Sequence, residues 1–202
     1  MKETILSRIS GWIDENSAIL ADANNAIWEF AETALKEERS STYLKQLLAQ
    51  NGFRILPGAA GVPTSFIAEW GAGTPVIGLL AEYDALAGLS QERSTICRPL
   101  RSGAPGHACG HCTLGAAVLG AALSLKTVME QEGLSGTLRF YGCPAEETLE
   151  GKVLMSRDHL FDDCDAALSW HPNDISYVWA RKSVALRSMK FVFHGRSLLM
   201  VG

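Results

Sequence analysis

The sequence of 202 residues lacks the cysteine content of a disulfide-rich protein, and the five cysteines that it holds are an odd number. The N-terminus lacks the basic region and the apolar run of a secretory signal, so we expect the protein in the cytoplasm. Thiols stay reduced in that compartment, and a disulfide framework is therefore not expected. Metal binding, catalysis and burial remain as uses for the cysteines.

Long hydrophobic runs and an excess of basic residues are also missing. The longest apolar stretch, residues 113–125, is shorter than the roughly 20 residues that cross a bilayer, so no membrane anchor is expected. The net charge is −4, and lysine and arginine form no stripe that would bind nucleic acid. The expected partner is a small molecule, with no nucleic acid and no membrane.

The remaining composition is that of a globular domain, with 47% hydrophobic and 20% charged residues. Apolar residues recur at helical spacing over residues 5–48, which predicts two or three amphipathic helices. Ser40, Ser41 or Thr42 is expected to cap the last of these helices. Short apolar runs separated by glycine and proline then predict strands at residues 53–56, 65–70 and 75–81.

Strands and helices alternate in the second half of the sequence. The patterns predict helices at residues 113–131 and 152–158, and strands at residues 137–142, 166–170 and 188–193. This alternation favours an α/β fold in which helices cover a layered sheet.

Polar side chains directly follow three of the predicted strands. Asp84 follows the apolar strand 75–81, Glu146 and Glu147 follow the strand 137–142, and His171 follows the strand 166–170. Ligands of open α/β sheets bind beyond the carboxyl ends of the strands, so we expect these four side chains to share one site.

The loop Gly106-His107-Ala108-Cys109-Gly110-His111 adds a thiol and an imidazole at the start of a helix. Cys109 and His111 can face one point, and this pair of donors suits zinc or a similar divalent metal. The helix N-terminus would favour the thiolate form of Cys109. Taken alone, each residue is more often a buried cysteine or an ordinary loop histidine, and only the residues that accompany them favour a metal site.

The two adjacent glutamates suit metal-assisted hydrolysis, because one carboxylate can bind metal while its neighbour acts as general base. The alternative is a solvated acidic pair, since glutamate is normally exposed. His171 is a third converging donor or a capped core residue. Asp84 is suited to orient a ligand histidine, or else is a turn residue at a strand end.

Other interpretations of the cysteine loop remain open. Cys109-Gly110-His111-Cys112 also matches the thiol-disulfide exchange motif, although a redox function leaves Glu146, Glu147 and His171 unexplained. Cys109 and Cys112 with two histidines would make a structural zinc site, but such sites usually present two cysteine or histidine pairs. A metal-binding or partner-binding remnant without catalytic activity is the third alternative.

Five segments of the chain together resemble the aminoacylase and carboxypeptidase type of co-catalytic metallopeptidase, in its amidohydrolase branch. They occur in the family's order and are residues 81–86, 106–111, 141–147, 160–167 and 170–172. The resemblance implies a three-layer zinc-peptidase-like catalytic domain, with a mixed sheet flanked by helices, and an α+β lid that joins two subunits into a homodimer. It also implies two zinc or manganese ions that help to cleave the amide bond of N-acyl or aminobenzoyl amino acids or small dipeptides.

The same resemblance implies a role for each site residue. Glu146 would be the general base, and Asp84 would be the aspartate that orients a ligand. The metal ligands would be Cys109, His111, Glu147 and His171.

The sequence departs from the family pattern in three respects. Cys112 stands where relatives have aspartate or asparagine, Ser197 leads into an apolar tail in the lid region, and the family's last metal-binding histidine is missing. We therefore expect residues 1–182 to be the N-terminal part of the catalytic domain and residues 183–202 a truncated start of the lid. Without the missing ligand, the second metal would be weakly held and hydrolysis impaired.

Overall fold

The computed structural model describes residues 4–178, 182, 184–186 and 189–195. The chain divides into two units, Met1–Pro172 and Asn173–Gly202. Within the described residues, all helices and strands belong to the first unit. In chain order they are α1 (Ile5–Glu15), α2 (Ser17–Phe30), α3 (Glu38–Gln50), β1 (Arg54–Pro57), the 3-10 turn η1 (Ala59–Gly61), β2 (Phe66–Ala72), β3 (Val76–Ala81), α4 (His111–Glu132), β4 (Gly136–Gly142), α5 (Gly151–Arg157) and β5 (Ala166–Leu168).

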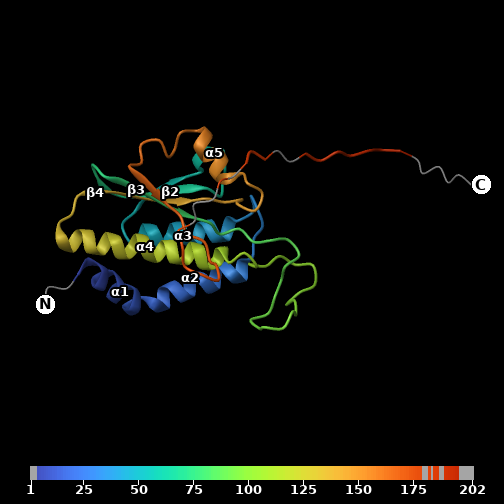
Figure 1. The fold of residues 1–202 in the computed structure, drawn as a ribbon, viewed down its shortest axis with the longest axis horizontal. Helices are drawn as coiled ribbons and strands as arrows, with labels where there is room; N and C mark the ends of the chain where they lie inside the picture. The colour runs from blue at the N-terminus through green and yellow to red at the C-terminus, as the bar shows by residue number, and fades with distance from the viewer. Residues whose placement is uncertain (1–3, 179–181, 183, 187–188, 196–202) are drawn as a thin grey trace, which may run out of the picture. The chain divides into compact units, whose positions relative to one another are not determined.

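The five strands form one mixed sheet in the order β1-β2-β4-β3-β5. β1 pairs with β2 and β2 with β4 in antiparallel fashion, whereas β3 runs parallel to both β4 and β5. Helices α1 to α4 lie on one side of this sheet and α5 on the other (Figure 1). The predicted mixed sheet flanked by helices is therefore confirmed.

Helix α4 is the central helix of the core. One side of it packs on α1 and α2 and another on β3 and β4. Gly115 allows this close packing, because a Cβ at that position would lie 2.9 Å from the carbonyl oxygen of Glu82. The first turn of α4 is thereby held against the segment that follows β3, which fixes His111 beside Glu82 and Asp84.

By length and hydropathy, α4 is the one helix among the described residues that could cross a membrane. Its most apolar window is 67% buried within the protein, as expected for the core helix of a folded domain. The helix is longer than the predicted one, because it begins at His111 and ends at Glu132.

The other predicted elements of the first unit lie within one or two residues of the observed ones, and the N-terminal region holds three helices. The prediction of a serine or threonine cap for α3 was wrong. The helix begins at Glu38, and the Glu32 carboxylate accepts hydrogen bonds from the Arg39 and Ser40 amides at 3.0 and 2.9 Å. A side chain from the preceding loop thus supplies the acceptor that a capping hydroxyl would have offered.

The second unit contains no helix or strand among its described residues. The strand predicted at residues 188–193 is not formed at residues 189–193, and residue 188 lies outside the described residues. Ser183, Ser197 and the tail after it also lie outside. The domain boundary after residue 182 and the lid beyond it therefore stay predictions.

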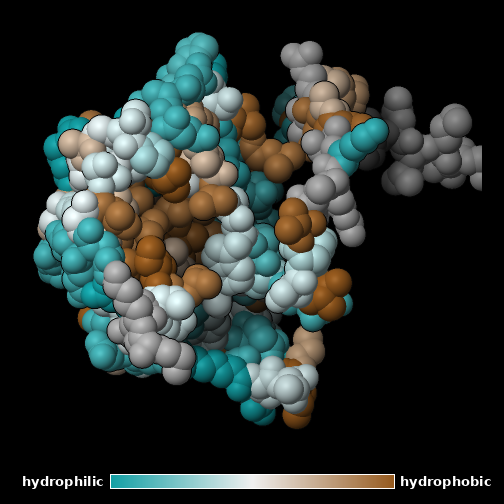
Figure 2. Space-filling model, turned by 60° about the vertical axis from the view of Figure 1, so that its left-hand side comes forward, coloured by the Kyte–Doolittle hydropathy of each residue, from teal (hydrophilic) through white to brown (hydrophobic). Residues whose placement is uncertain are grey.

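Hydrophobic side chains also reach the surface of the first unit. Leu6 of α1 and Leu168 of β5 are exposed, and all three residues of β5 are exposed at the edge of the sheet. Figure 2 shows hydrophobic residues gathered in a hollow on one face of the molecule. The core is therefore not covered by polar residues on every side.

Candidate metal centre

The candidate site lies at the carboxyl ends of the three parallel strands. Asp84 follows β3, Glu146 and Glu147 follow β4, His171 follows β5, and His111 is the first residue of α4. Because β3 is parallel to both β4 and β5, these strand ends meet at one edge of the sheet. The topology therefore brings together residues that are up to 87 positions apart in sequence.

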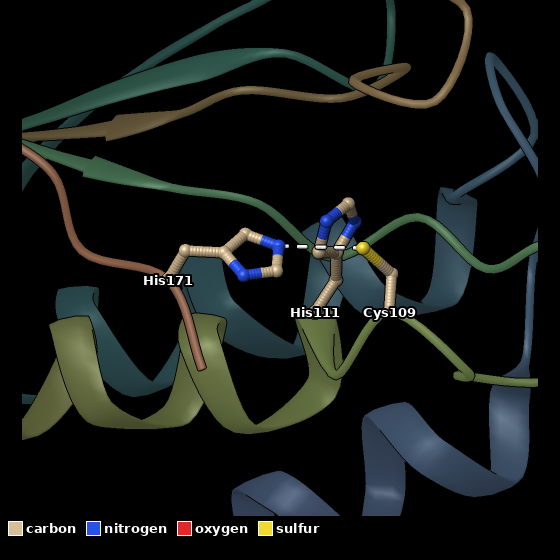
Figure 3. A group of neighbouring side chains, drawn as sticks. All are labelled: Cys109, His111 and His171. Carbon is tan, nitrogen blue, oxygen red and sulfur yellow. Dashed lines mark hydrogen bonds between the residues drawn. The ribbon is translucent and has the colours of Figure 1, made fainter. Parts of the chain in front are cut away.

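Cys109, His111 and His171 form the first group of possible metal ligands (Figure 3). The Cys109 Sγ lies 3.3 Å from Nε2 of His171, and the two histidine rings stand edge to face with centroids 5.6 Å apart. One ligand atom from each residue lies within 4.8 Å of the others. A second group with the same spacing shares His111 and adds Glu82 and Glu146.

Both histidines turn Nε2 toward this cluster, while Nδ1 forms hydrogen bonds with other groups. Nδ1 of His111 lies 2.8 Å from Oδ1 of Asp84 and 3.1 Å from its carbonyl oxygen, and Nδ1 of His171 lies 2.8 Å from the carbonyl oxygen of Pro172. A carbonyl oxygen only accepts hydrogen bonds, so each Nδ1 donates. The Nε2 atoms are left to bind a cation, which is the usual arrangement of metal-ligating histidines.

Asp84 links the histidine to the glutamate turn. The side chain is 1% exposed; Oδ1 accepts from His111, and Oδ2 accepts from the Glu147 amide at 2.9 Å. Burial opposes ionisation of this carboxyl, but the hydrogen bonds from His111 and the Glu147 amide outweigh burial and lower the pKa of Asp84. Asp84 is therefore an anion that fixes the His111 ring and the Glu147 amide relative to each other.

The same carboxylates act on His111. Burial alone would lower the pKa of His111, but the hydrogen bond to Asp84 and the charges of Asp84, Glu82 and Glu147 raise it. The ring therefore lies in a strongly negative environment that favours a proton or a metal cation on Nε2.

Glu146 and Glu147 lie near His111 at different depths. Oε2 of Glu146 is 3.8 Å from Nε2 of His111, and Oε1 of Glu147 is 4.0 Å from it. Burial first, and then the charge of Glu82, raises the pKa of Glu146. Glu147 belongs to neither of the two groups whose ligand atoms all lie within 4.8 Å, although its Oε1 atom is buried.

The turn that carries these glutamates is held from two directions. Ala145 adopts the left-handed conformation with φ of 56°, and its amide donates to Oε1 of Glu37 at 2.9 Å. Gly151 passes so close to Pro144 that a Cβ would collide with the proline carbonyl oxygen. Glu37 is fully buried and reaches this turn from the start of α3.

Sequence reasoning did not select Glu82, Glu37 or Lys152. Glu82 is 5% exposed, faces His111 and forms an ion pair with Lys152 of α5. The position of Glu82 directly after the apolar strand 75–81 could have indicated a site residue, but Asp84 was the residue selected from that segment. Nothing in the amphipathic pattern of α3 indicates that Glu37 turns inward.

The protein groups around Cys109 do not favour the expected thiolate form. Burial, followed by the charge of Glu147 and a hydrogen bond with it, raises the pKa of Cys109 to about 12. Burial and the nearby carboxylates thus outweigh the helix N-terminus, whose effect on a thiol is modest. A bound cation would reverse this balance.

Cys112 lies outside the site. It is 4% exposed, belongs to the main hydrophobic core, and burial raises the pKa of its thiol. A disulfide exchange motif needs an accessible thiol of low pKa, and neither Cys109 nor Cys112 offers one. The structure therefore does not favour the redox function or the zinc site built on both cysteines.

The residues fit a divalent cation. Three buried polar atoms at the site have no hydrogen-bond partner: Nε2 of His111, Oε2 of Glu82 and Oε1 of Glu147. Buried polar atoms without partners are costly, and a metal ion is the partner that a thiol, imidazoles and carboxylates share.

The sequence and fold match known hydrolases. The model of "Peptidase family M20/M25/M40" matches residues 78–184. The chain is 42% identical over 193 residues to one subunit of the p-aminobenzoyl-glutamate hydrolase of Escherichia coli (strain K12), and the match covers 88% of this chain and 40% of the relative. It is 32% identical over 145 residues to "N-acetyl-L-cysteine deacetylase" of Bacillus subtilis (strain 168), covering 71% and 33%. The chain thus spans about 40% or less of these relatives' length.

Solved structures of other proteins have a similar fold. A Bacillus subtilis protein described as a dinuclear metal binding peptidase from the M20 family has a TM-score of 0.64 and 26% identity, covering 78% of this chain and 44% of its own. The aminobenzoyl-glutamate utilization protein from Klebsiella pneumoniae has a TM-score of 0.59 at 14% identity, covering 79% and 45%, and supports the fold.

Proposed function

Since this chain belongs to peptidase family M20/M25/M40, we propose that it carries a metal centre and general base that hydrolyse the amide bond of N-acyl or aminobenzoyl amino acids or small dipeptides. One observation carries the proposal. The buried Nε2 atom of His111 has no hydrogen-bond partner, yet thiol, imidazole and carboxylate groups surround it. Amide hydrolysis assisted by a divalent metal uses such a set of donors.

Cys109, His111, Glu147 and His171 are the residues that would hold the metal. Two divalent ions, zinc or manganese, would polarise the amide carbonyl and make water a stronger acid when bound. Asp84 keeps the His111 ring in one orientation and holds the Glu147 amide, so it positions two ligands at once.

Glu146 is the residue that would move the proton. It lies on the turn after β4, and burial raises the pKa of its carboxyl toward the range in which a carboxylate works well as a general base. It would accept a proton from the attacking water and pass it to the nitrogen of the leaving amine. Glu146 is 29% exposed, so that it can be reached by substrate.

The substrate class is supported by the relatives' names. A hydrolase of p-aminobenzoyl-glutamate, an Xaa-Arg dipeptidase of Mus musculus at 29% identity, and a deacetylase of N-acetyl-L-cysteine share an amide bond to an amino acid as the bond that is cleaved. A small-molecule amide is therefore the proposed substrate. A homodimer formed through a lid and a location in the cytoplasm belong to the same proposal.

The test begins with metal analysis of the purified chain after chelator treatment and reloading with zinc or manganese. About two ions per chain would support a nearly complete site, and one ion a partial site. The absence of a bound ion would contradict the metal centre and favour a remnant without catalytic activity.

Turnover is then measured on p-aminobenzoyl-glutamate and N-acetyl amino acids, with wild type and Glu146→Gln compared. We expect a metal-dependent rate that falls by about 10²-fold or more in the variant, because the general base is lost. An equal rate in Glu146→Gln would contradict the role of Glu146. The expectation of impaired hydrolysis fails if the 202-residue chain matches the rate of a longer relative.

A further inference from the structure

Glu82 is a buried carboxylate of the site to which no role has yet been given. It follows β3 by one residue and is 5% exposed. Lys152 of α5 donates to its Oε1 atom, whereas its Oε2 atom is buried without a hydrogen-bond partner. The free oxygen lies 3.2 Å from Nε2 of His111, which is also buried without a hydrogen-bond partner.

The separation of these two atoms suits two ligands of one cation. Zinc binds imidazole nitrogen and carboxylate oxygen at about 2.0 to 2.2 Å, so neighbouring ligand atoms around one ion lie roughly 3 to 3.5 Å apart. Glu82, His111 and Glu146 each offer one ligand atom, and these atoms lie within 4.8 Å of one another. The Glu82 oxygen is therefore where a further ligand would be.

The charge of the site also favours a cation near Glu82. Four carboxylates, Glu82, Asp84, Glu146 and Glu147, surround His111, and within the described residues Lys152 is the lysine or arginine that pairs with them. Buried carboxylates without compensating positive charge are strongly disfavoured. Lys152 balances one of them and leaves the others to be balanced by His111 and by metal.

We propose that Glu82 is a further ligand of the metal centre, which binds through Oε2 while Lys152 holds Oε1. This inference rests on the proposed function, since it assigns one more residue to the same metal site. In this proposal Lys152 has two effects on Glu82. It holds Oε1 and so leaves Oε2 free for the metal, and its positive charge competes with the metal for the same carboxylate. The alternative is that Glu82 only forms an ion pair with Lys152 and a protonated His111.

The test measures the affinity for Zn²⁺ and for Mn²⁺ by competition with a chromophoric chelator. We expect Glu82→Gln to bind Mn²⁺ at least tenfold more weakly, and Zn²⁺ less affected, because carboxylate oxygen is the preferred donor of manganese. Glu69→Gln is the matched control. Glu69 forms ion pairs with Arg54 and Arg139 outside the site, so its loss should change neither affinity by more than about twofold.

Lys152→Met gives a prediction of opposite sign. Without the competing ammonium group, both oxygens of Glu82 become available, and the affinity for Mn²⁺ should rise severalfold. A carboxylate that only served an ion pair would act on a metal through its charge alone, and each variant would then change the affinities for Mn²⁺ and Zn²⁺ by the same factor. If Glu82→Gln does not fold, Glu82→Asp replaces it in the test. This variant keeps the charge, but its side chain is shorter by one methylene, so it should still weaken Mn²⁺ binding.

The outcomes separate the two proposals. Wild type that binds neither ion would overturn the proposed metal centre and, with it, the role of Glu82. Wild type that binds metal while Glu82→Gln binds Mn²⁺ as tightly as the Glu69→Gln control would overturn the role of Glu82 alone. A loss of Mn²⁺ affinity in Glu82→Gln that exceeds the loss of Zn²⁺ affinity, with a gain in Lys152→Met, would support the inference.

Discussion

Replacing Glu37 tests whether a buried carboxyl holds the turn that bears the general base. Oε1 of Glu37 accepts hydrogen bonds from the amides of Leu35 at 3.0 Å and Ala145 at 2.9 Å. Its Oε2 atom and the hydroxyl of Thr64 are buried without partners. Glu37→Ala would remove the acceptor, whereas Glu37→Gln would keep it and add a donor beside the Thr64 hydroxyl.

The expected cost follows from the two amides. A buried donor left without a partner costs about 1 to 3 kcal/mol, and here the Ala145 amide is buried and the Leu35 amide partly buried. We therefore expect Glu37→Ala to lower the free energy of unfolding by about 3 kcal/mol. Glu37→Gln should remain within about 1 kcal/mol of wild type, because both amides keep their acceptor.

The pH dependence gives a second measurement. Burial raises the pKa of Glu37 above its ordinary value of 4.5, so the folded state holds this proton more tightly than the unfolded state does. The resulting stability is fully present below about pH 4.5 and is lost as the pH rises through the higher pKa of the folded state. Glu37→Gln has no such proton, and its stability relative to wild type should increase over that range.

Urea denaturation followed by tryptophan fluorescence, at pH values from about 4 to 8, measures both effects. The loosened turn of Glu37→Ala should also weaken metal binding, since Glu146 and Glu147 follow Ala145 directly. The reasoning is refuted if Glu37→Ala loses less than about 1 kcal/mol, or if Glu37→Gln is destabilised as strongly as Glu37→Ala.

Three further substitutions test other contacts of the site. Asp84→Asn should weaken metal binding about 10- to 100-fold, as for other residues that orient ligands, and an unchanged affinity in chelator competition would contradict its role. Gly110→Ala should lose more metal affinity than the control Gly88→Ala. The two glycines have similar φ values, 78° and 76°, but a Cβ at residue 110 would lie 3.1 Å from the Pro172 ring, whereas a Cβ at residue 88 would have no atom within 4 Å. Equal affinities in these two variants would show that the proline contact does not matter. Cys112→Ser should bind metal within about twofold of wild type, because the thiol packs in the core, and lost binding in a variant that keeps the wild-type fold would contradict that placement.

The convergence of the site residues was predictable from the sequence. Asp84, Glu146 and His171 each follow an apolar run of strand length, and the rule that ligands bind beyond the carboxyl ends of strands needs no knowledge of distances. The alternation of patterns predicted a layered α/β sheet, whereas the mixed sheet flanked by helices was expected only from the resemblance to the family. Local periodicity therefore located the helices and strands of the first unit but not the order and direction of the strands.

Contacts between distant parts of the chain were not predictable in this way. Glu82 and Asp84 both follow β3, and a sequence pattern does not reveal that both are buried or that Lys152, 70 residues later, pairs with one of them. The thiol of Cys109 shows the same limit. Its local position at a helix start favours ionisation, but burial, and after it the carboxylates that follow β4 and β3, raise its pKa.

The strand order constrains the synthesis of this domain. β3 lies between β4 and β5, both of which follow it in the chain, and α4 is made before either of them. Until the ribosome has passed Gly142, the helix α4 of 22 residues cannot pack on the pair of strands β3 and β4. In this interval the apolar face of α4 that later packs on the sheet is exposed, and exposed apolar surface favours aggregation and chaperone binding. Metal binding cannot shorten this interval. His111 is synthesised before the interval ends, but Glu147 and His171 are synthesised only afterwards.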